Sequence, residues 1–204
     1  FNAAFVSRYR LSPTALRKDS QDDDGSVTGS RDEAFAVRLA YRPPYDLPGV
    51  LRFFGDRAVP GIEVVQGHEL RRTLAWPHGG QLLKGWLAAR FVPERNEVHV
   101  RVAPPLVPVL GALLQRLRQA LDLDAEPDQI DSALAALPLP VIAGLRVPNG
   151  LDGFEIAARV ILGQQITVAA ARTITARLVD RFGEALETPF ADLHRLFPRS
   201  EEHT

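Results

Sequence analysis

Residues 152–172 constrain the fold most, because two apolar helical patterns are separated there by the short polar break Gly163-Gln164-Gln165. Apolar residues recur at intervals of three and four on both sides of the break, which is the periodicity of amphipathic helices. The pattern predicts two helices that meet at a tight turn. The two glutamines either satisfy backbone groups inside a buried helical hairpin or lie on an exposed tip that contacts a ligand.

Three residues predict where these two helices begin and end. Asp152 can cap the first helix and Thr167 the second, because their side-chain oxygens accept hydrogen bonds from free backbone N–H groups. Gly183 is expected to end the second helix in a left-handed conformation, which glycine adopts without steric cost.

The same residues resemble a known family. Asp152-Gly153-Phe154-Glu155 and the run ARVILGQQITVAAA (158–171) resemble the start of the catalytic domain of bacterial 3-methyladenine-DNA glycosylases of the AlkA type, members of the helix-hairpin-helix glycosylase superfamily. Upstream segments resemble the opening of the same proteins: Tyr41-Arg42-Pro43-Pro44-Tyr45-Asp46, Leu51-Arg52-Phe53-Phe54 and Arg57-Ala58-Val59. The similarity extends in order from Phe35 to Pro198.

The middle of the chain predicts an α+β fold, an antiparallel sheet with helices on one face. Short segments with the residue pattern of strands are found at 35–41, 62–65, 70–76, 81–88 and 98–102. Helical patterns cover 47–58 and 106–121, and Pro127 is expected near the start of a further helix. This order suits the amino-terminal domain that the resemblance implies, followed by the first helices of an all-α helix-hairpin-helix glycosylase domain.

We expect the α+β domain to span residues 35–145 and the truncated start of the helical domain to span 146–198. Residues 1–18 resemble the last helix and closing Ser-Pro segment of AraC-type helix-turn-helix regulators. Residues 19–34 are expected to be an acidic linker, because six acidic residues against one arginine cannot form a core. Residues 199–204 resemble a translated sequencing adapter, and we expect them to be a non-native tail.

Composition excludes several kinds of site. The chain has no cysteine, so it contains no disulfide, thiolate zinc site or cysteine nucleophile. Its five histidines are scattered, and Asp22-Asp23-Asp24 lacks the bracketing ligands of a cation site, so no metal and no cofactor are expected. No apolar run approaches the roughly 18 residues of a transmembrane helix. We therefore expect no membrane partner and a bacterial cytoplasmic location.

The resemblance implies base-excision repair, in which the N-glycosidic bond of an alkylated purine is hydrolysed after the nucleotide is flipped out of double-stranded DNA. In the family, the turn enters the minor groove and the side chain at the position of Gln165 fills the gap. Here glutamine occupies a position where leucine can stand. Gln164 would position the tip, Gly163 would permit the close turn, and Thr167 would help to present phosphate-facing N–H groups.

The resemblance also implies that Phe53 lines the base pocket. A cationic alkylated purine is attracted to an aromatic face by roughly 0.5–2 kcal/mol. The alternative is that Phe53 simply packs in the core. Arg172, Arg177 and Arg181 either contact phosphates or form a solvated face. Because the net charge is only −1, attraction to DNA must come from local groups of this kind.

The family's catalytic aspartate follows a hairpin with a Leu-Pro-Gly-Ile-Gly type signature, which does not occur in these 204 residues. We expect that aspartate beyond Pro198, and we assign its role to neither Asp180 nor Asp192. The parent protein is expected to be a monomeric, nucleoid-associated DNA-3-methyladenine glycosylase II joined to an alkylation-responsive transcription regulator, while this chain alone is inactive. The alternatives are a non-catalytic DNA-binding transcription regulator or damage-recognition protein, and a module that binds a small molecule.

Overall fold

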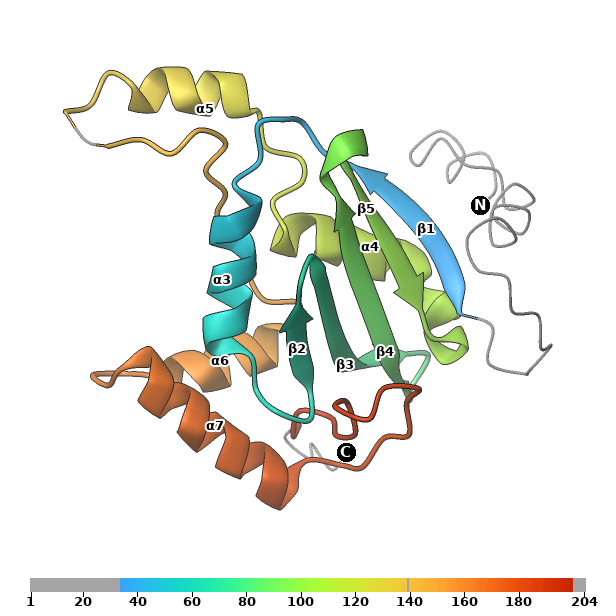
Figure 1. The fold of residues 1–204 in the computed structure, drawn as a ribbon. Coiled ribbons are helices and arrows are strands. Elements are labelled where there is room, and N and C mark those ends of the chain that lie inside the picture. The colour runs from blue at the N-terminus through green and yellow to red at the C-terminus, as the bar shows by residue number, and fades with distance from the viewer. Residues whose placement is uncertain (1–33, 139, 200–204) are drawn as a thin grey trace.

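The computed structural model describes residues 34–138 and 140–199. A five-stranded sheet in the order β1-β5-β4-β3-β2 forms its centre, and every pair of neighbouring strands is antiparallel (Figure 1). The strands are β1 (Phe35–Ala40), β2 (Glu63–Gln66), β3 (Glu69–His78), β4 (Gln81–Val92) and β5 (Glu97–Val102). The expected regulator segment, the linker up to residue 33 and residues 200–204 lie outside the described residues.

Helices accompany this sheet, which confirms the α+β class. They are α3 (Leu47–Arg57), α4 (Leu110–Ala120), α5 (Pro127–Leu134), α6 (Gly153–Leu162) and α7 (Val168–Phe182), with the 3-10 turns η2 (Pro93–Arg95) and η3 (Pro104–Val109). The helix expected over 106–121 begins as η3 and becomes α-helical only at Leu110. Prolines 104, 105 and 108 explain this start, because proline cannot donate the backbone hydrogen bonds of an α-helix.

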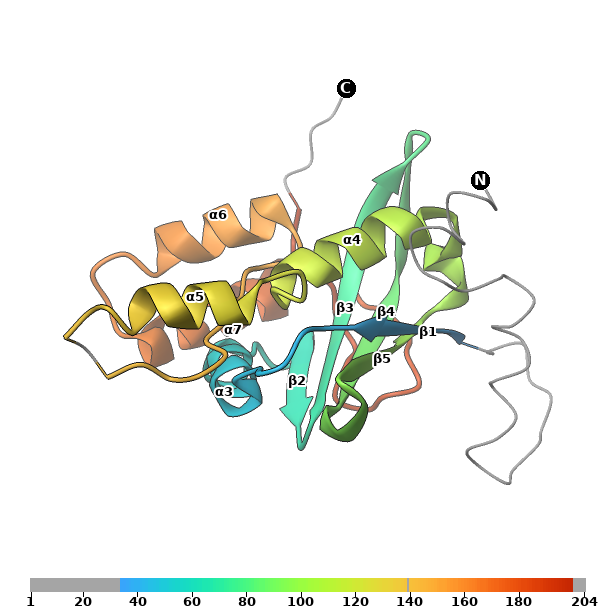
Figure 2. The ribbon, with the colours of Figure 1, turned by 90° about the horizontal axis from the view of Figure 1, so that it is seen from above.

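The sheet is covered on both faces. Helix α4 packs on one face, where Leu87 of β4 and Val100 of β5 share a fully buried core with Leu113 and Leu117 (Figure 2). Side chains alternate between faces along a strand, so Trp86 and Ala88 point to the opposite face. There Trp86 meets the ring of Phe190 edge-on at 5.0 Å. The segment after α7 thus covers the face of the sheet that α4 leaves open.

Helices α6 and α7 form the predicted hairpin, which packs beside α3 (Figure 1). Val179 of α7 is buried against Val59 and Ile62, which lie between α3 and β2. Both predicted caps are confirmed. The Asp152 carboxylate accepts from Glu155 N at 2.9 Å, and the Thr167 hydroxyl accepts from Ala170 N at 3.2 Å.

The prediction for Gly183 is wrong in one respect. Gly183 ends α7, but with φ −71° and ψ 134° it is extended rather than left-handed. Glycine is needed there for a different reason: a Cβ would collide with the carbonyl oxygens of Val179 and Leu196. The chain turns tightly after α7 because the returning segment packs directly against the end of the helix.

Candidate functional site

A pocket of about 320 Å³ lies between α3, α6 and α7. Its apolar wall is formed by Phe53, Phe54, Ile156, Val160, Ile166 and Val168. Two of the residues predicted from sequence, Phe53 and Gly163, line this one pocket. The other three, Gln164, Gln165 and Thr167, lie outside it on the adjoining turn between α6 and α7.

The turn itself is exposed. Gln165 has a φ of 61°, a left-handed conformation that reverses the chain between the two helices. Both glutamine side chains are exposed, and within residues 34–138 and 140–199 neither makes a side-chain hydrogen bond. Of the two interpretations of the sequence, the exposed tip is the one observed. The glutamine amides are therefore available to a ligand.

Gly163 ends α6 at a position where a side chain would meet the backbone of the same helix. Its φ of −91° is open to any residue, so conformational freedom is not the reason for a glycine. A Cβ there would lie 3.0 Å from the carbonyl oxygen of Arg159 and 3.5 Å from Cβ of Ala171. The first distance is tight and the second is an ordinary van der Waals contact, so a side chain at position 163 would disturb the last turn of α6.

Phe53 and Phe54 both line the pocket, and Phe54 also packs against the core of the α+β domain. The two rings meet edge-on at 5.4 Å with an interplanar angle of 89°. The guanidinium of Arg57, one turn further along α3, lies 4.1 Å from the centroid of the Phe53 ring. Phe53 is therefore a partly exposed aromatic wall of the pocket.

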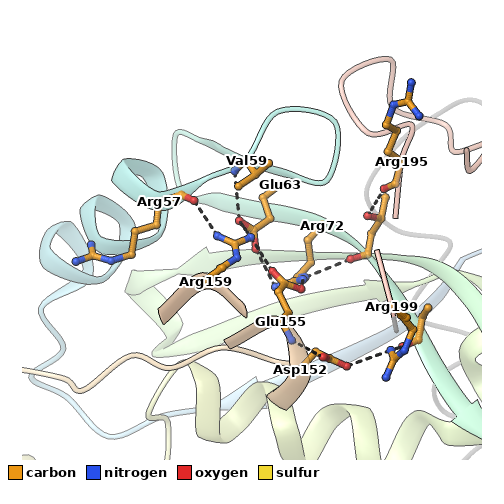
Figure 3. Close-up of polar contacts among 11 residues, drawn as sticks. Arg57, Val59, Glu63, Arg72, Asp152, Glu155, Arg159, Arg195 and Arg199 are labelled. Atoms are coloured by element: carbon orange, nitrogen blue, oxygen red, sulfur yellow. Dashed lines mark hydrogen bonds and ion pairs between the residues drawn. The ribbon is translucent and has the colours of Figure 1, made fainter. Parts of the chain in front are cut away.

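A buried network of charges joins the sheet to α6, and the sequence analysis did not predict it (Figure 3). Arg72 of β3 binds two carboxylates: Nη1 lies 2.9 Å from Glu63 Oε1 and Nη2 lies 2.7 Å from Glu155 Oε2. Arg159 pairs with the same carboxylates, 2.9 Å from Glu63 Oε2 and 2.6 Å from Glu155 Oε1. The two acids and two arginines thus form a closed, neutral cluster.

The cluster is shielded from water. The exposed fractions of the side chains of Arg72, Glu63 and Glu155 are only 6%, 9% and 7%. Burial alone lowers the pKa of Arg72, but the carboxylates of Glu155 and Glu63 outweigh this effect, so that pKa is raised above its usual value. Arg159 also donates to the carbonyl oxygen of Arg57 at 3.0 Å. The cluster therefore ties α6 to both the sheet and the end of α3.

Part of this cluster has a signal in the sequence. Glu155 and Arg159 are four residues apart, the spacing of an ion pair on one helix face. Glu63 lies directly opposite Arg72 in the β2–β3 hairpin, so the register of the hairpin would predict that pair. The two links between these pairs, Arg72–Glu155 and Arg159–Glu63, join residues 83 and 96 positions apart, and no local pattern indicates them.

Of the other charged residues considered in the sequence, the fold places some at the pocket and others away from it. Arg172 lines the pocket, whereas Arg177 and Arg181 do not. Asp180 lies 3.8 Å from Arg195, and Asp192 pairs with Arg71 at 3.2 Å; neither aspartate lines the pocket. Arg199, expected to belong to the tail, donates to the carbonyl oxygen of Ala75 at 2.8 Å and lies 3.2 Å from the Asp152 carboxylate.

In the described part of the chain, no group of three or more histidine, aspartate or glutamate side chains could hold a metal ion. None of the helices in this part of the chain has the length and apolar character needed to cross a membrane.

The sheet, its helices and the adjoining hairpin define an α+β domain followed by a helical segment, a fold also found in a DNA glycosylase. A 3-methyladenine DNA-glycosylase from Archaeoglobus fulgidus matches with a TM-score of 0.58 and 21% identity, over 79% of this chain and 55% of that one. More particularly, the family model described as the AlkA N-terminal domain matches residues 36–152, and the chain belongs to that family. The resemblance inferred from the sequence is confirmed.

Two relatives with similar sequences support the same family assignment. A Mycobacterium tuberculosis protein named "Probable bifunctional transcriptional activator/DNA repair enzyme AlkA" is 32% identical over 93% of this chain and 38% of its own length. The Escherichia coli protein named "DNA-3-methyladenine glycosylase 2" is 34% identical over 73% of this chain and 51% of its own length. The chain thus spans about half or less of these relatives.

Proposed function

We propose that this chain is the DNA-recognition part of an AlkA-type DNA-3-methyladenine glycosylase II. The parent enzyme hydrolyses the N-glycosidic bond of alkylated purines in double-stranded DNA after flipping the damaged nucleotide. One observation carries this proposal: Phe53 and Gly163 line a single pocket, and the exposed Gln165 lies two residues beyond Gly163. A surface that enters DNA and a pocket that receives a base must be adjacent in this way.

Each residue of the turn then has a role. Gln165 fills the gap left by the flipped nucleotide and hydrogen-bonds to a neighbouring base, Gln164 positions the tip, and Gly163 permits the close turn. The Thr167 hydroxyl caps α7 by accepting from the N–H of Ala170, which leaves the N–H groups of Val168 and Ala169 for a phosphate. Phe53 offers its ring to the flipped base.

The parent protein is proposed to act as a monomer on chromosomal DNA, at the nucleoid in the bacterial cytoplasm. It also carries an alkylation-responsive transcription regulator, which ends in residues 1–18. Two facts support this part: the resemblance of that segment to AraC-type regulators and the bifunctional name of the Mycobacterium tuberculosis relative.

This chain alone is proposed to be inactive, because it contains no residue in the position of the family's catalytic aspartate. Asp180 within α7 and Asp192 after it, the two aspartates from Val168 to Pro198, do not line the pocket. Release of methylated purines from alkylated duplex DNA by the purified chain would contradict this view.

The role of Gln165 is tested with a duplex that contains an abasic-site mimic next to 2-aminopurine. Gln165→Ala should weaken binding by about 3- to 10-fold, the equivalent of one hydrogen bond, and should reduce the fluorescence increase that reports unstacking. Gln165→Leu should keep the unstacking signal, because an apolar side chain also fills the gap. Gln115→Ala, an exposed glutamine on α4, is the matched control. Unchanged affinity and unchanged fluorescence for Gln165→Ala would refute the proposed role.

A further inference from the structure

Arg57 covers the aromatic face that a flipped base would use. Its guanidinium lies 4.1 Å from the centroid of the Phe53 ring, and its Nη1 donates to the carbonyl oxygen of Phe53 at 3.1 Å. Both residues line the pocket. In this conformation a planar base cannot stack on the same face of the ring, and a cationic base would also meet a like charge.

Arg57 differs from most other charged residues of the pocket because it has no acidic partner. Glu63, Glu155, Arg72 and Arg159 neutralise one another, and Asp152 pairs with Arg199. Within the described residues, no carboxylate pairs with Arg57 or Arg172, which line the pocket from α3 and α7. An unpaired guanidinium at an exposed site binds a phosphate group more strongly than it binds a neutral ring.

The backbone of Arg57 is held by another residue, whereas the contacts of its exposed side chain are with Phe53. Arg159 of the buried cluster donates to the Arg57 carbonyl oxygen at 3.0 Å, which holds the end of α3 against α6. The Arg57 side chain is exposed. A rotation of this side chain alone would uncover Phe53 without moving either helix.

We propose that Arg57 is a gate that couples phosphate contact to entry of the base. In the free protein its guanidinium occupies the face of Phe53. In the DNA complex it leaves the ring for a backbone phosphate next to the flipped nucleotide, and the ring becomes available. This inference rests on the proposed function, and it adds that the pocket accepts a base attached to DNA in preference to the same base without phosphates.

The test compares Arg57→Gln with the wild-type chain in two titrations. The first uses 7-methylguanosine, a nucleoside without phosphate, at slightly acidic pH where its base is cationic, and follows binding by NMR. Loss of the guanidinium should raise the affinity by about 2- to 5-fold, the range of an exposed cation–π contact. The second uses a duplex with an abasic-site mimic at several salt concentrations. Here Arg57→Gln should weaken binding and reduce the slope of log K against log salt by about 0.9, the value of one phosphate contact.

Two variants control for charge and for the ring. Arg116→Gln removes the same charge from an exposed position on α4 and should change neither titration. Phe53→Leu in the Arg57→Gln background should cancel the gain in nucleoside affinity. Thermal unfolding should show that Arg57→Gln folds like the wild type, since the side chain is exposed.

Opposite signs in the two titrations support the gate. A gain in nucleoside affinity with an unchanged salt slope would refute the coupling to phosphate, and weaker nucleoside binding would show that Arg57 holds the base instead. No change in either titration would mean that the contact with Phe53 has no functional consequence. If the wild-type chain does not prefer the abasic duplex over an intact one, the proposed function itself fails; if it does and Arg57→Gln behaves like the wild type, only the gate fails.

Discussion

Replacement of Arg72 by methionine should destabilise this protein more than any exposed charge change. Arg72 of β3 forms ion pairs with both Glu63 and Glu155, and methionine keeps much of its apolar stem while it removes the charge. Two buried carboxylates would then share Arg159, whose side chain is 22% exposed. The interior cannot solvate the uncompensated negative charge that remains.

The expected cost is about 3 kcal/mol, the lower end of the range for removing one partner of a buried ion pair, because Arg159 still contacts both carboxylates. Small domains have a total stability of about 5–15 kcal/mol, so this loss is a large share. With a urea m-value of about 2 kcal/mol per molar, the midpoint of unfolding should fall by about 1.5 M.

Urea unfolding followed by circular dichroism measures this effect. Arg42→Met provides the matched control, because Arg42 pairs with Glu126 at 3.1 Å but both side chains are about half exposed, with fractions of 56% and 51%. That change should cost about 1 kcal/mol or less. The double variant Arg72→Met/Glu155→Gln restores the charge balance of the cluster, and its cost should be smaller than the sum of the single costs by about 1–3 kcal/mol.

Two results would refute this reasoning. If Arg72→Met and Arg42→Met lower the urea midpoint equally, burial of the cluster has no energetic consequence. If the costs of Arg72→Met and Glu155→Gln simply add in the double variant, the two side chains are not coupled, and the cluster does not tie α6 to the sheet.

Two further predictions concern packing away from the pocket. Burial raises the pKa of Tyr45, whose hydroxyl donates to the carbonyl oxygen of Leu121 at 2.7 Å. The contribution of this group to the free energy of unfolding is therefore intact below its ordinary pKa of 10.0, and it is lost as the pH rises above that value. Tyr45→Phe should therefore cost about 1 kcal/mol at neutral pH and reduce the loss of stability at alkaline pH, and an equally steep alkaline loss would contradict the assignment. Gly183→Ala should cost about 1–3 kcal/mol in thermal or urea unfolding, because its Cβ collides with backbone carbonyls. Gly111→Ala on α4, where a Cβ meets nothing within 4 Å, should instead be stabilising by about 0.5–1 kcal/mol, and equal effects of the two changes would disprove the packing argument.

The sequence predicted those parts of the fold that depend on neighbouring residues. Periodicity located the strands and the hairpin, and capping chemistry located the starts of α6 and α7. The prediction failed where both faces of a strand are covered, because the alternation of buried and exposed side chains is then lost. Strand β4 was expected to end at residue 88 but continues to Val92. From Trp86 to Ala89 every side chain is buried, because α4 covers one face and the segment after α7 covers the other, so the alternation that marks a strand is lost.

Long-range contacts explain the other differences. Gly183 is extended because Leu196, which returns to the end of α7, occupies the space that a side chain would need. The buried cluster forms only where α6 packs against the β2–β3 hairpin. The sequence of neither segment alone predicts this contact. The resemblance indicated Phe53 and the turn as parts of one site, but only the fold brings Phe53 and Gly163 to the same pocket.

The net charge of the chain is therefore a poor guide to the charge of its site. A value of −1 over 204 residues argues against DNA binding driven by a broadly basic surface. At the pocket, however, two glutamates cancel two arginines and Asp152 cancels Arg199, so the charges that remain are those of Arg57 and Arg172. Both guanidiniums line a mostly apolar pocket, Arg57 from α3 and Arg172 from α7. Under the proposed function, they attract the phosphates that flank a nucleotide while the pocket receives its base. On that proposal, a locally positive rim around an uncharged pocket takes the place of overall basicity, and it acts only where the DNA backbone and a flipped base are presented together.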